Sequence, residues 1–321
     1  MFPVTRIATE VAEALKMKLF GSSGFRGVVD EDFMRITFKL ALAVGKVAQS
    51  TLVGTDTRTS GDAVKHCVIS GLLTAGSRAY DAGIVPTPTL AYNCREFQAG
   101  VMLTASHNPP QYNGIKLWNP DGSAFDTNQR KHIEQLMVDE RQETTPWQLM
   151  ERYVQFPEAV EKHTNRILDN FTGSFPLKVA LDCGCGAGSM ATPYIVRELG
   201  CEVIALNSFP SGFFPRGIEP LPGNLVDLIE TIRATGADLG LAHDADADRL
   251  TVVDDKGRVV PGDKLLILLA RDLGARKIVT TVDASMTIEE QGLDVIRTRV
   301  GDVYVAEELR NGGDFGGEPS G

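Results

Sequence analysis

The chain has 321 residues, of which 43% are hydrophobic, and it carries a formal net charge of −10 at pH 7. This length predicts two to three domains with cores of their own. The negative charge argues against nucleic acid and membrane surfaces as partners, because a phosphate backbone requires a basic face. No apolar run approaches the roughly 20 residues that span a bilayer. The composition leaves homo-oligomerisation open.

The cysteines indicate a reducing environment. Their number, five, is odd and they lack paired C-x-x-C spacing, so we expect neither a disulfide framework nor a zinc site. Cys183 and Cys185 form only a weak redox or metal signal. Reduced thiols are typical of cytoplasmic enzymes, and no signal peptide is visible because charged residues interrupt the N-terminal apolar stretch. We therefore expect a cytoplasmic protein.

The N-terminal third of the chain alternates between two kinds of element. Residues 1–16 have apolar residues at helical spacing and read either as an extension or as an ordinary packed helix. After them, predicted strands at 52–54 and 79–84 enclose a predicted helix at 63–75. Such alternation of apolar strands and amphipathic helices predicts an α/β fold with mainly parallel pairing.

The segment 100–118, GVMLTASHNPPQYNGIKLW, carries the first chemical signal. Its apolar start predicts a short buried strand, which the two prolines at 109–110 prevent from continuing. Polar side chains follow that strand, namely Ser106, His107, Asn108 and Lys116. The set suits covalent phosphoryl transfer, because serine can carry a phosphoryl group while histidine and lysine move protons or balance charge. A polar turn that caps the strand is the alternative.

A second α/β unit is predicted over residues 176–255, after a polar stretch at 139–147 and a predicted helix at 151–168. It opens with a strand and a glycine-rich turn at 179–188, which resembles the first motif of S-adenosylmethionine-dependent methyltransferases. Such enzymes place an acidic residue at the end of the next strand, where this chain has Asn207. A tight strand–helix turn without a cofactor is the alternative.

Within this unit, the run GLAHDADADRLTVVD at 240–254 predicts a metal site. Asp244, Asp246 and Asp248 point the same way in an extended loop, and oxygen ligands favour Mg²⁺ or Ca²⁺ over zinc. Three like charges this close repel unless a cation or a basic partner neutralises them; an exposed acidic loop is the alternative. An EF-hand is excluded, because Arg249 stands where its loop requires glycine and a predicted strand follows.

A third unit follows a turn at 256–258. It has a predicted helix at 263–273, a predicted strand at 278–282 and two glycine-containing segments, TRVGD at 298–302 and GGEPSG at 316–321.

Four sets of motifs, in this order, resemble those of the α-D-phosphohexomutases, the family of phosphomannomutase, phosphoglucomutase and phosphoglucosamine mutase. They are GSSGFRG at 21–27, TASHNP with NGIK at 104–116, DADADR at 244–249, and the two segments of the third unit. The family's phosphoserine loop reads T-[AG]-S-H-N-P, its metal loop D-G-D-A-D-R and its sugar-binding loop G-G-E-x-S-G. Ala245 stands where the metal loop usually has glycine, and alanine would be poorly tolerated if this position needs a positive φ.

The resemblance implies a phosphoserine enzyme that interconverts hexose or hexosamine 1-phosphate and 6-phosphate through a 1,6-bisphosphate, with Mg²⁺ as cofactor. Ser106 would carry the phosphoryl group and ligate Mg²⁺ together with the three aspartates. Acid–base catalysis and charge balance would fall to Arg26, His107 and Lys116. Asn108 and Arg249 would hold neighbouring groups of the site in place, and substrate would be bound by Gly301, Asp302, Glu318 and Ser320.

The resemblance also implies consecutive three-layer α/β domains with mixed, mainly parallel sheets. We expect an N-terminal extension (1–16), a phosphoserine-loop domain (17–150), a metal-loop domain (151–255) and a sugar-loop domain (256–321). The sequence ends at Gly321, inside the sugar-binding loop, so the third domain is expected to be incomplete. The family's fourth, phosphate-binding domain has no counterpart here, so we expect the chain to be a fragment. A fragment that binds metal but has little mutase activity, or a non-catalytic sugar-phosphate-binding protein, is therefore the alternative.

Overall fold

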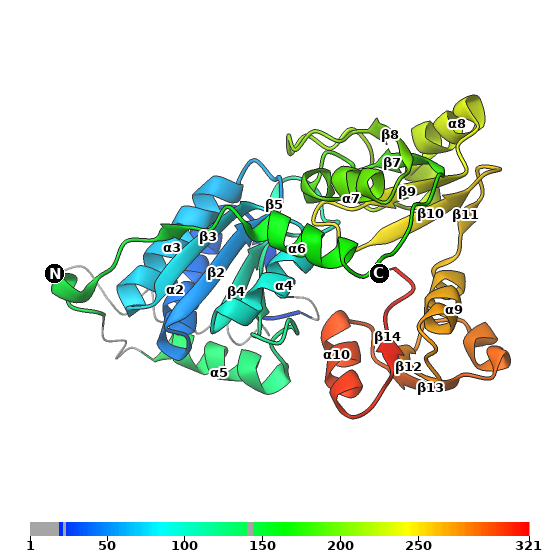
Figure 1. Cartoon of the computed structure of the whole chain (residues 1–321). Helices are drawn as coiled ribbons and strands as arrows, with labels where there is room; N and C mark the ends of the chain where they lie inside the picture. The colour runs from blue at the N-terminus through cyan, green and yellow to red at the C-terminus, as the bar shows by residue number, and fades with distance from the viewer. Residues whose placement is uncertain (1–18, 22–23, 140–143, 321) are drawn as a thin grey trace.

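The computed structural model describes residues 19–21, 24–139 and 144–320. The extension predicted at 1–16 and the last residue of the predicted sugar loop lie outside the described residues. The described chain forms three α/β units in sequence order, each around its own sheet. Figure 1 shows the first unit on the left, the second at the upper right and the third at the lower right, with the C-terminal segment running back to the middle. The predicted α/β class is confirmed.

The first sheet has the strand order β1-β5-β4-β2-β3-β6. Its strands are β1 (Phe25–Val28), β2 (Ser50–Thr55), β3 (Arg78–Ile84), β4 (Ala99–Leu103), β5 (Tyr112–Trp118) and β6 (Val154–Gln155). Strand β2 pairs in parallel with β3 and β4, whereas β5 pairs antiparallel with β4 and β1. The carboxyl ends of β2, β3 and β4 therefore lie at one edge of the sheet, where ligands bind in open α/β folds.

Helices cover both faces of this sheet, because strands of a mostly parallel sheet are apolar on both sides. They are α2 (Glu31–Val47), α3 (Gly61–Ala75), α4 (Thr87–Asn93), α5 (Thr127–Val138) and α6 (Ala159–Leu168), with short 3₁₀ turns at Cys94–Glu96 and Trp147–Leu149. One buried cluster lies under α2, α3 and α5 and contains Leu40, Val68 and Ile133. A second, on the other face, contains Leu90 of α4 and Ala159 of α6.

The helix predicted at 151–168 is wrong in its first half. Helix α6 begins only at Ala159, and residues 154–155 form β6, which pairs in parallel with β3. Pro157 explains the difference: proline lacks a backbone donor and disfavours the helical conformation of the residue before it.

The second sheet has the order β11-β10-β9-β7-β8. Its strands are β7 (Lys178–Asp182), β8 (Glu202–Leu206), β9 (Leu239–His243), β10 (Leu250–Asp254) and β11 (Val259–Val260), accompanied by α7 (Thr192–Glu198), α8 (Val226–Thr235) and 3₁₀ turns at Ala187–Met190 and Pro222–Asn224. Strands β7, β8 and β9 are parallel, while β9, β10 and β11 form an antiparallel meander. This sheet thus continues past residue 255, where we predicted the domain to end.

The third unit has a parallel sheet with β12 (Lys277–Thr281) between β13 (Asp294–Thr298) and β14 (Phe315–Gly316). Its helices are α9 (Gly262–Asp272) and α10 (Asp302–Arg310), with a 3₁₀ turn at Met286–Gln291. The predicted helix and strand agree with α9 and β12 to within one residue.

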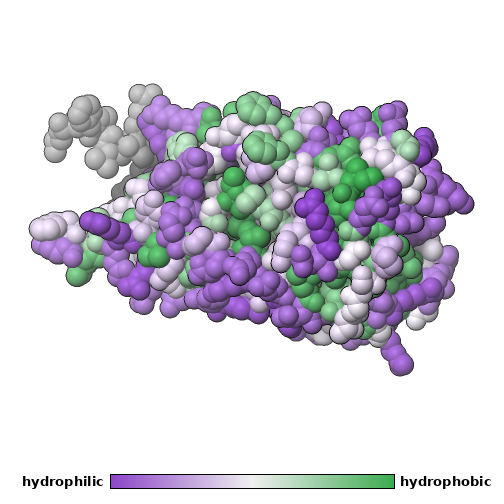
Figure 2. Space-filling model, turned by 45° about the horizontal axis from the view of Figure 1, so that its top comes forward, coloured by the Kyte–Doolittle hydropathy of each residue, from purple (hydrophilic) through white to green (hydrophobic). Residues whose placement is uncertain are grey.

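Exposed apolar side chains occur on and after α9, among them Leu268, Leu269 and Leu273. On the face drawn in Figure 2, hydrophobic residues gather in several separate areas among hydrophilic ones.

Among the described residues, no helix combines the length and the apolar character that a membrane span requires.

Replacing Gly114 with alanine should loosen the first sheet. A Cβ atom there would lie 2.5 Å from the carbonyl oxygen of Thr104 and 2.6 Å from that of Phe25, so the flanking backbone must move. We expect a loss of about 1–3 kcal/mol in the free energy of unfolding, as for other overpacked sites. Urea denaturation measures it. Gly223→Ala is the control, because its Cβ would meet nothing within 4 Å; equal losses in the two variants would contradict the prediction.

Candidate active site

Ser106 lies on the loop after β4, and its hydroxyl faces the metal loop of the second unit. Its Oγ donates to Asp244 Oδ2 at 2.7 Å and lies 3.4 Å from His107 Nδ1. The residue is 1% exposed and has a φ of 49°, in the left-handed region that non-glycine residues rarely adopt. A nucleophile in such a backbone conformation must be held there by its surroundings.

Arg58 holds the serine loop in place. It follows β2, its side chain is fully buried, and it forms an ion pair with Asp56 at 3.0 Å. The other guanidinium nitrogens donate to backbone carbonyls of the loop, those of Ser106, Asn108, Pro109 and Tyr112. The planar fork of arginine is suited to several acceptors at once. The sequence analysis assigned Arg58 no role. The pattern that could have pointed to it is the charged D-T-R run directly after a buried strand.

Asp56 extends this network to the backbone of the nucleophile. The Thr104 hydroxyl donates to Asp56 Oδ2 at 2.6 Å and accepts from the Ser106 N–H at 2.8 Å. Burial raises the pKa of Asp56 to about 6, although the Arg58 guanidinium opposes this shift. The loop thus depends on a charged pair without access to water.

The three aspartates of the metal loop lie between β9 and β10, with carboxylate oxygens within 4.8 Å of one another. Asp244 and Asp246 are buried, while 31% of the Asp248 side chain is exposed. Burial raises the pKa of Asp244 well above its usual range, and the neighbouring carboxylates Asp246 and Asp248 add to this effect. The structure thus brings the three aspartate side chains together, as we predicted from their spacing.

Lys116 reaches the same cluster from the first unit. It lies on β5 opposite Met102 of β4, and its Nζ donates to Asp246 at 2.8 Å and to Asp248 at 2.5 Å. Burial alone would lower the pKa of Lys116, but the two carboxylates outweigh it and raise the pKa far above its usual value. Burial likewise would raise the pKa of Asp246, but the Lys116 ammonium holds it well below its usual range.

The cluster fits a divalent cation. Three carboxylates and one ammonium leave an excess of two negative charges in a buried place, which is unfavourable without compensation. Asp246 Oδ1 is buried and has no hydrogen-bond donor among the described residues. The available ligand atoms are all oxygens, which bind hard cations such as Mg²⁺ and Ca²⁺.

The glycine-rich turn after β7 supports the metal loop. A Cβ on Gly186 would lie 2.7 Å from the carbonyl oxygen of Ala245, and the N–H of Ala187 donates to that oxygen at 2.7 Å. Asp182 at the end of β7 pairs with Arg216 at 2.7 Å, and Arg216 donates to the carbonyl of His243. The turn therefore approaches protein backbone where a methyltransferase would approach its cofactor.

The positive φ that was a concern for Ala245 occurs instead at Ala247. Ala245, which stands where the family usually has glycine, does not have a positive φ, whereas Ala247 does, at 54°. Ala245 is buried and its carbonyl is held by the turn after β7.

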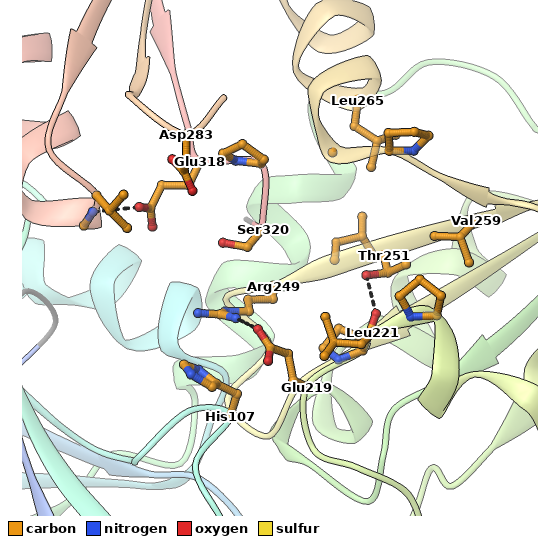
Figure 3. Close-up of a pocket in the computed structure, with 18 of the residues that line it drawn as sticks. His107, Glu219, Leu221, Arg249, Thr251, Val259, Leu265, Asp283, Glu318 and Ser320 are labelled. Carbon is orange, nitrogen blue, oxygen red and sulfur yellow. Dashed lines mark hydrogen bonds and ion pairs between the residues drawn. The ribbon is translucent and has the colours of Figure 1, made fainter. Parts of the chain in front are cut away.

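A cavity of about 730 Å³ lies between the three units, and Figure 3 shows the side chains around it. His107 and Arg249 lie on its lower side in the figure, while Glu318 and Ser320 approach from the third unit. Its lining also includes Arg26 and Gly301.

Of the predicted site residues, only Arg26, His107, Arg249, Gly301, Glu318 and Ser320 line this cavity. Ser106, Asn108 and the three aspartates lie outside its lining, as do Lys116 and Asp302. Lys116 is buried behind it with the aspartates, and Asp302 starts α10 beside a small separate pocket. Arg26 donates to Asn108 Oδ1 at 2.8 Å, and Glu318 accepts from the Gly301 N–H at 2.7 Å.

Acidic residues that sequence reasoning did not assign also line the cavity. Glu219 pairs with Arg249, and Asp283 lies beside Glu318 (Figure 3). Burial raises the pKa of Glu318, with Asp302 and Asp283 contributing. Burial lowers the pKa of His107, and Arg249 reinforces this. The I-E-P run at 218–220, which follows the F-P pair at 214–215, was the sequence signal for that residue.

Three family models match the chain, described as phosphoglucomutase/phosphomannomutase, alpha/beta/alpha domains I, II and III. They match residues 17–144, 152–257 and 261–321. A probable phosphoglucosamine mutase from Methanococcoides burtonii is 49% identical over 313 residues, which are 95% of this chain and 72% of that protein. A phosphoglucosamine mutase from Methanococcus aeolicus is 41% identical over 323 residues, covering 95% and 71% of the two chains.

Solved structures show the same architecture. A phosphoglucomutase/phosphomannomutase family protein from Burkholderia thailandensis superposes with a TM-score of 0.84 at 28% identity, over 94% of this chain and 71% of that one. A putative phosphomannomutase from Thermus thermophilus gives a TM-score of 0.79 at 29% identity, over 94% and 74% of the two chains.

Arg58→Met should destabilise the protein by about 3–5 kcal/mol near pH 8, because it leaves Asp56 buried without its partner. The loss should be smaller at pH 5, since the pKa of Asp56 is already about 6 and a protonated Asp56 leaves no unpaired charge. Urea denaturation at the two pH values tests this. Arg35→Met is the control, because the Arg35–Glu31 pair is exposed and should contribute at most about 1 kcal/mol. A loss at pH 5 equal to that at pH 8 would contradict the account.

Proposed function

Because this chain belongs to the phosphoglucomutase/phosphomannomutase family, we propose that it is a phosphohexomutase, an isomerase that moves a phosphoryl group within one sugar phosphate. Its substrates are hexose or hexosamine phosphates. Among these we propose glucosamine 1-phosphate and glucosamine 6-phosphate, because the relatives at 49% and 41% identity bear the name phosphoglucosamine mutase. The observation that carries the proposal is the Ser106 hydroxyl, which lies between His107 and Asp244 of the aspartate cluster next to the cavity.

Ser106 is the proposed phosphoryl carrier. In its phosphorylated form, the bond between Ser106 Oγ and phosphorus breaks as the free hydroxyl of the sugar phosphate forms a new bond to phosphorus. The hydroxyl proton leaves to a nearby base, Ser106 Oγ takes up a proton as it leaves phosphorus, and the product is a sugar 1,6-bisphosphate. The reverse transfer, from the other end of that intermediate, restores phosphorylated Ser106. The sum is an isomerisation without net consumption of phosphate.

The groups around Ser106 suit this exchange. His107 is within 3.4 Å of Oγ and can move a proton, while Lys116 and Arg26 supply positive charge on the side of the first unit. Asp244, Asp246 and Asp248 are the proposed Mg²⁺ ligands, with an oxygen of Ser106. The ion would offset the negative charge of the transferring phosphoryl oxygens, on which catalysis of such transfers mainly depends.

The cavity is the proposed sugar site. Glu318 and Ser320 offer acceptors and a donor for sugar hydroxyls. Gly301 lines the same cavity and precedes α10, which begins at Asp302. The carboxylates of Glu219, Asp283 and Glu318 also suit the ammonium group of a hexosamine. Arg249, which pairs with Glu219, is proposed to orient that carboxylate at the cavity wall.

Ser106→Ala should abolish phosphoryl transfer. Incubation of the purified chain with a hexose 1,6-bisphosphate should add one phosphoryl group, which peptide mapping places on Ser106, and the alanine variant should stay unmodified. Turnover of glucosamine 6-phosphate should fall by several orders of magnitude, the usual scale for loss of a covalent nucleophile. Ser70→Ala, on an exposed position of α3, is the control. Phosphate on Thr104, or an active Ser106→Ala variant, would refute the assignment. Phosphorylated Ser106 without turnover would favour the non-catalytic sugar-phosphate-binding alternative.

Mg²⁺ should raise the melting temperature of the chain through the three aspartates. A ligand that binds only the folded state stabilises it by about 2.7 kcal/mol at a concentration 100 times its Kd. Changing Asp244, Asp246 and Asp248 to asparagine removes the charge while nearly keeping the shape, so the Mg²⁺-dependent rise should disappear. Asp255→Asn, at the exposed turn after β10, should keep it. The same rise in the triple variant would show that the ion binds elsewhere.

A further inference from the structure

Thr87 belongs to the first unit but contacts the metal loop of the second. It is the first residue of α4, is 1% exposed, and lies between Pro86 and Pro88, which restrict the backbone on both sides. Its N–H donates to the Asp246 carbonyl at 2.8 Å, and its hydroxyl donates to Asp246 Oδ2 at 2.6 Å. First-turn N–H groups have no acceptor inside their own helix, so this one is available to the loop.

The two oxygens of Asp246 are in different environments. Oδ2 accepts from the Thr87 hydroxyl and from Lys116 Nζ at 2.8 Å, which occupies it with two donors. Oδ1 is equally buried but has no hydrogen-bond donor in the described part of the chain. A buried carboxylate oxygen without a partner is costly, and a cation held by Asp244, Asp246 and Asp248 would remove that cost.

We propose that Thr87 is a positioning residue for the cation: its hydroxyl and N–H fix the Asp246 carboxylate so that Oδ1, and not Oδ2, faces the metal. This inference rests on the proposed cation site and adds to it a residue of the other unit. The first unit would then act on Asp246, a ligand that belongs to the second unit, in two ways. Thr87 orients its carboxylate, and Lys116 compensates its negative charge.

The hydroxyl of Thr87 can be tested separately from the charge of Lys116. Lys116 contacts both Asp246 and Asp248, so its replacement changes the charge at two ligands. The Thr87 hydroxyl contacts Asp246 alone, and its removal leaves every charge in place. Thr89 offers a matched comparison, because it is a fully buried threonine of the same helix whose hydroxyl pairs with His163 Nδ1 at 2.9 Å.

The experiment is calorimetric titration of Mg²⁺ into the chain after phosphatase treatment, for wild type and for Thr87→Val, Thr87→Ser and Thr89→Val. Thr87→Val should weaken Mg²⁺ binding by about 10- to 100-fold, the usual effect of losing a group that orients a metal ligand. Thr87→Ser, which keeps the hydroxyl, should bind as wild type does, and so should Thr89→Val. Melting curves without Mg²⁺ should show a comparable loss for both valine variants, while the Mg²⁺-dependent rise should be reduced only in Thr87→Val.

Unchanged Mg²⁺ affinity in Thr87→Val would overturn this inference while leaving the cation site intact, if binding still disappears when the three aspartates become asparagine. Weak binding in Thr87→Ser would also overturn it, because the hydroxyl would then not be the group that matters. Binding that survives the triple asparagine change would overturn the cation site and this inference together. If valine prevents folding, Thr87→Ala is measured against Thr89→Ala with the same expectations.

Discussion

The buried cluster of Lys116 with Asp244, Asp246 and Asp248 is the constraint on which the arrangement of the first two units depends. The ammonium comes from one sheet and the carboxylates from the other, and both are largely removed from water. Separating the units would expose the cluster, and misaligning them would leave buried charge uncompensated, which costs several kcal/mol. The excess of negative charge in the cluster is also what makes it receptive to a divalent cation.

The conformation of Ser106 is maintained by contacts outside its own loop. A left-handed backbone at a serine is unfavourable by itself, so the groups around it must impose it. The Arg58 guanidinium holds the loop carbonyls and, through Asp56 and Thr104, the Ser106 N–H. The nucleophile is therefore held in place by a network of buried polar groups, Arg58, Asp56 and Thr104.

The positions of these groups follow from the parallel strands. Asp56, Thr87 and Ser106 come after β2, β3 and β4, whose carboxyl ends share one edge of the first sheet. The metal loop follows β9 of the second sheet, and Asp283 follows β12 of the third. Ligand sites in open α/β sheets form at such edges. The cavity between the three units is lined by residues that follow such strands, namely His107 after β4, Arg249 after β9 and Asp283 after β12.

The sequence by itself determined the α/β class, the serine loop and the aspartate triad. Those signals are local: Ser106 lies within a few residues of its strand, and residues two apart in an extended loop share a direction. Only the tertiary structure decided the roles of Arg58, Thr87 and Glu219. Arg58 contacts carbonyls 48 to 54 residues away, and Thr87 contacts a carboxylate 159 residues away. Such contacts depend on strand order and on how two units pack. An amino-acid pattern specifies which side chains are available, but the packing of distant elements selects the pairs that meet.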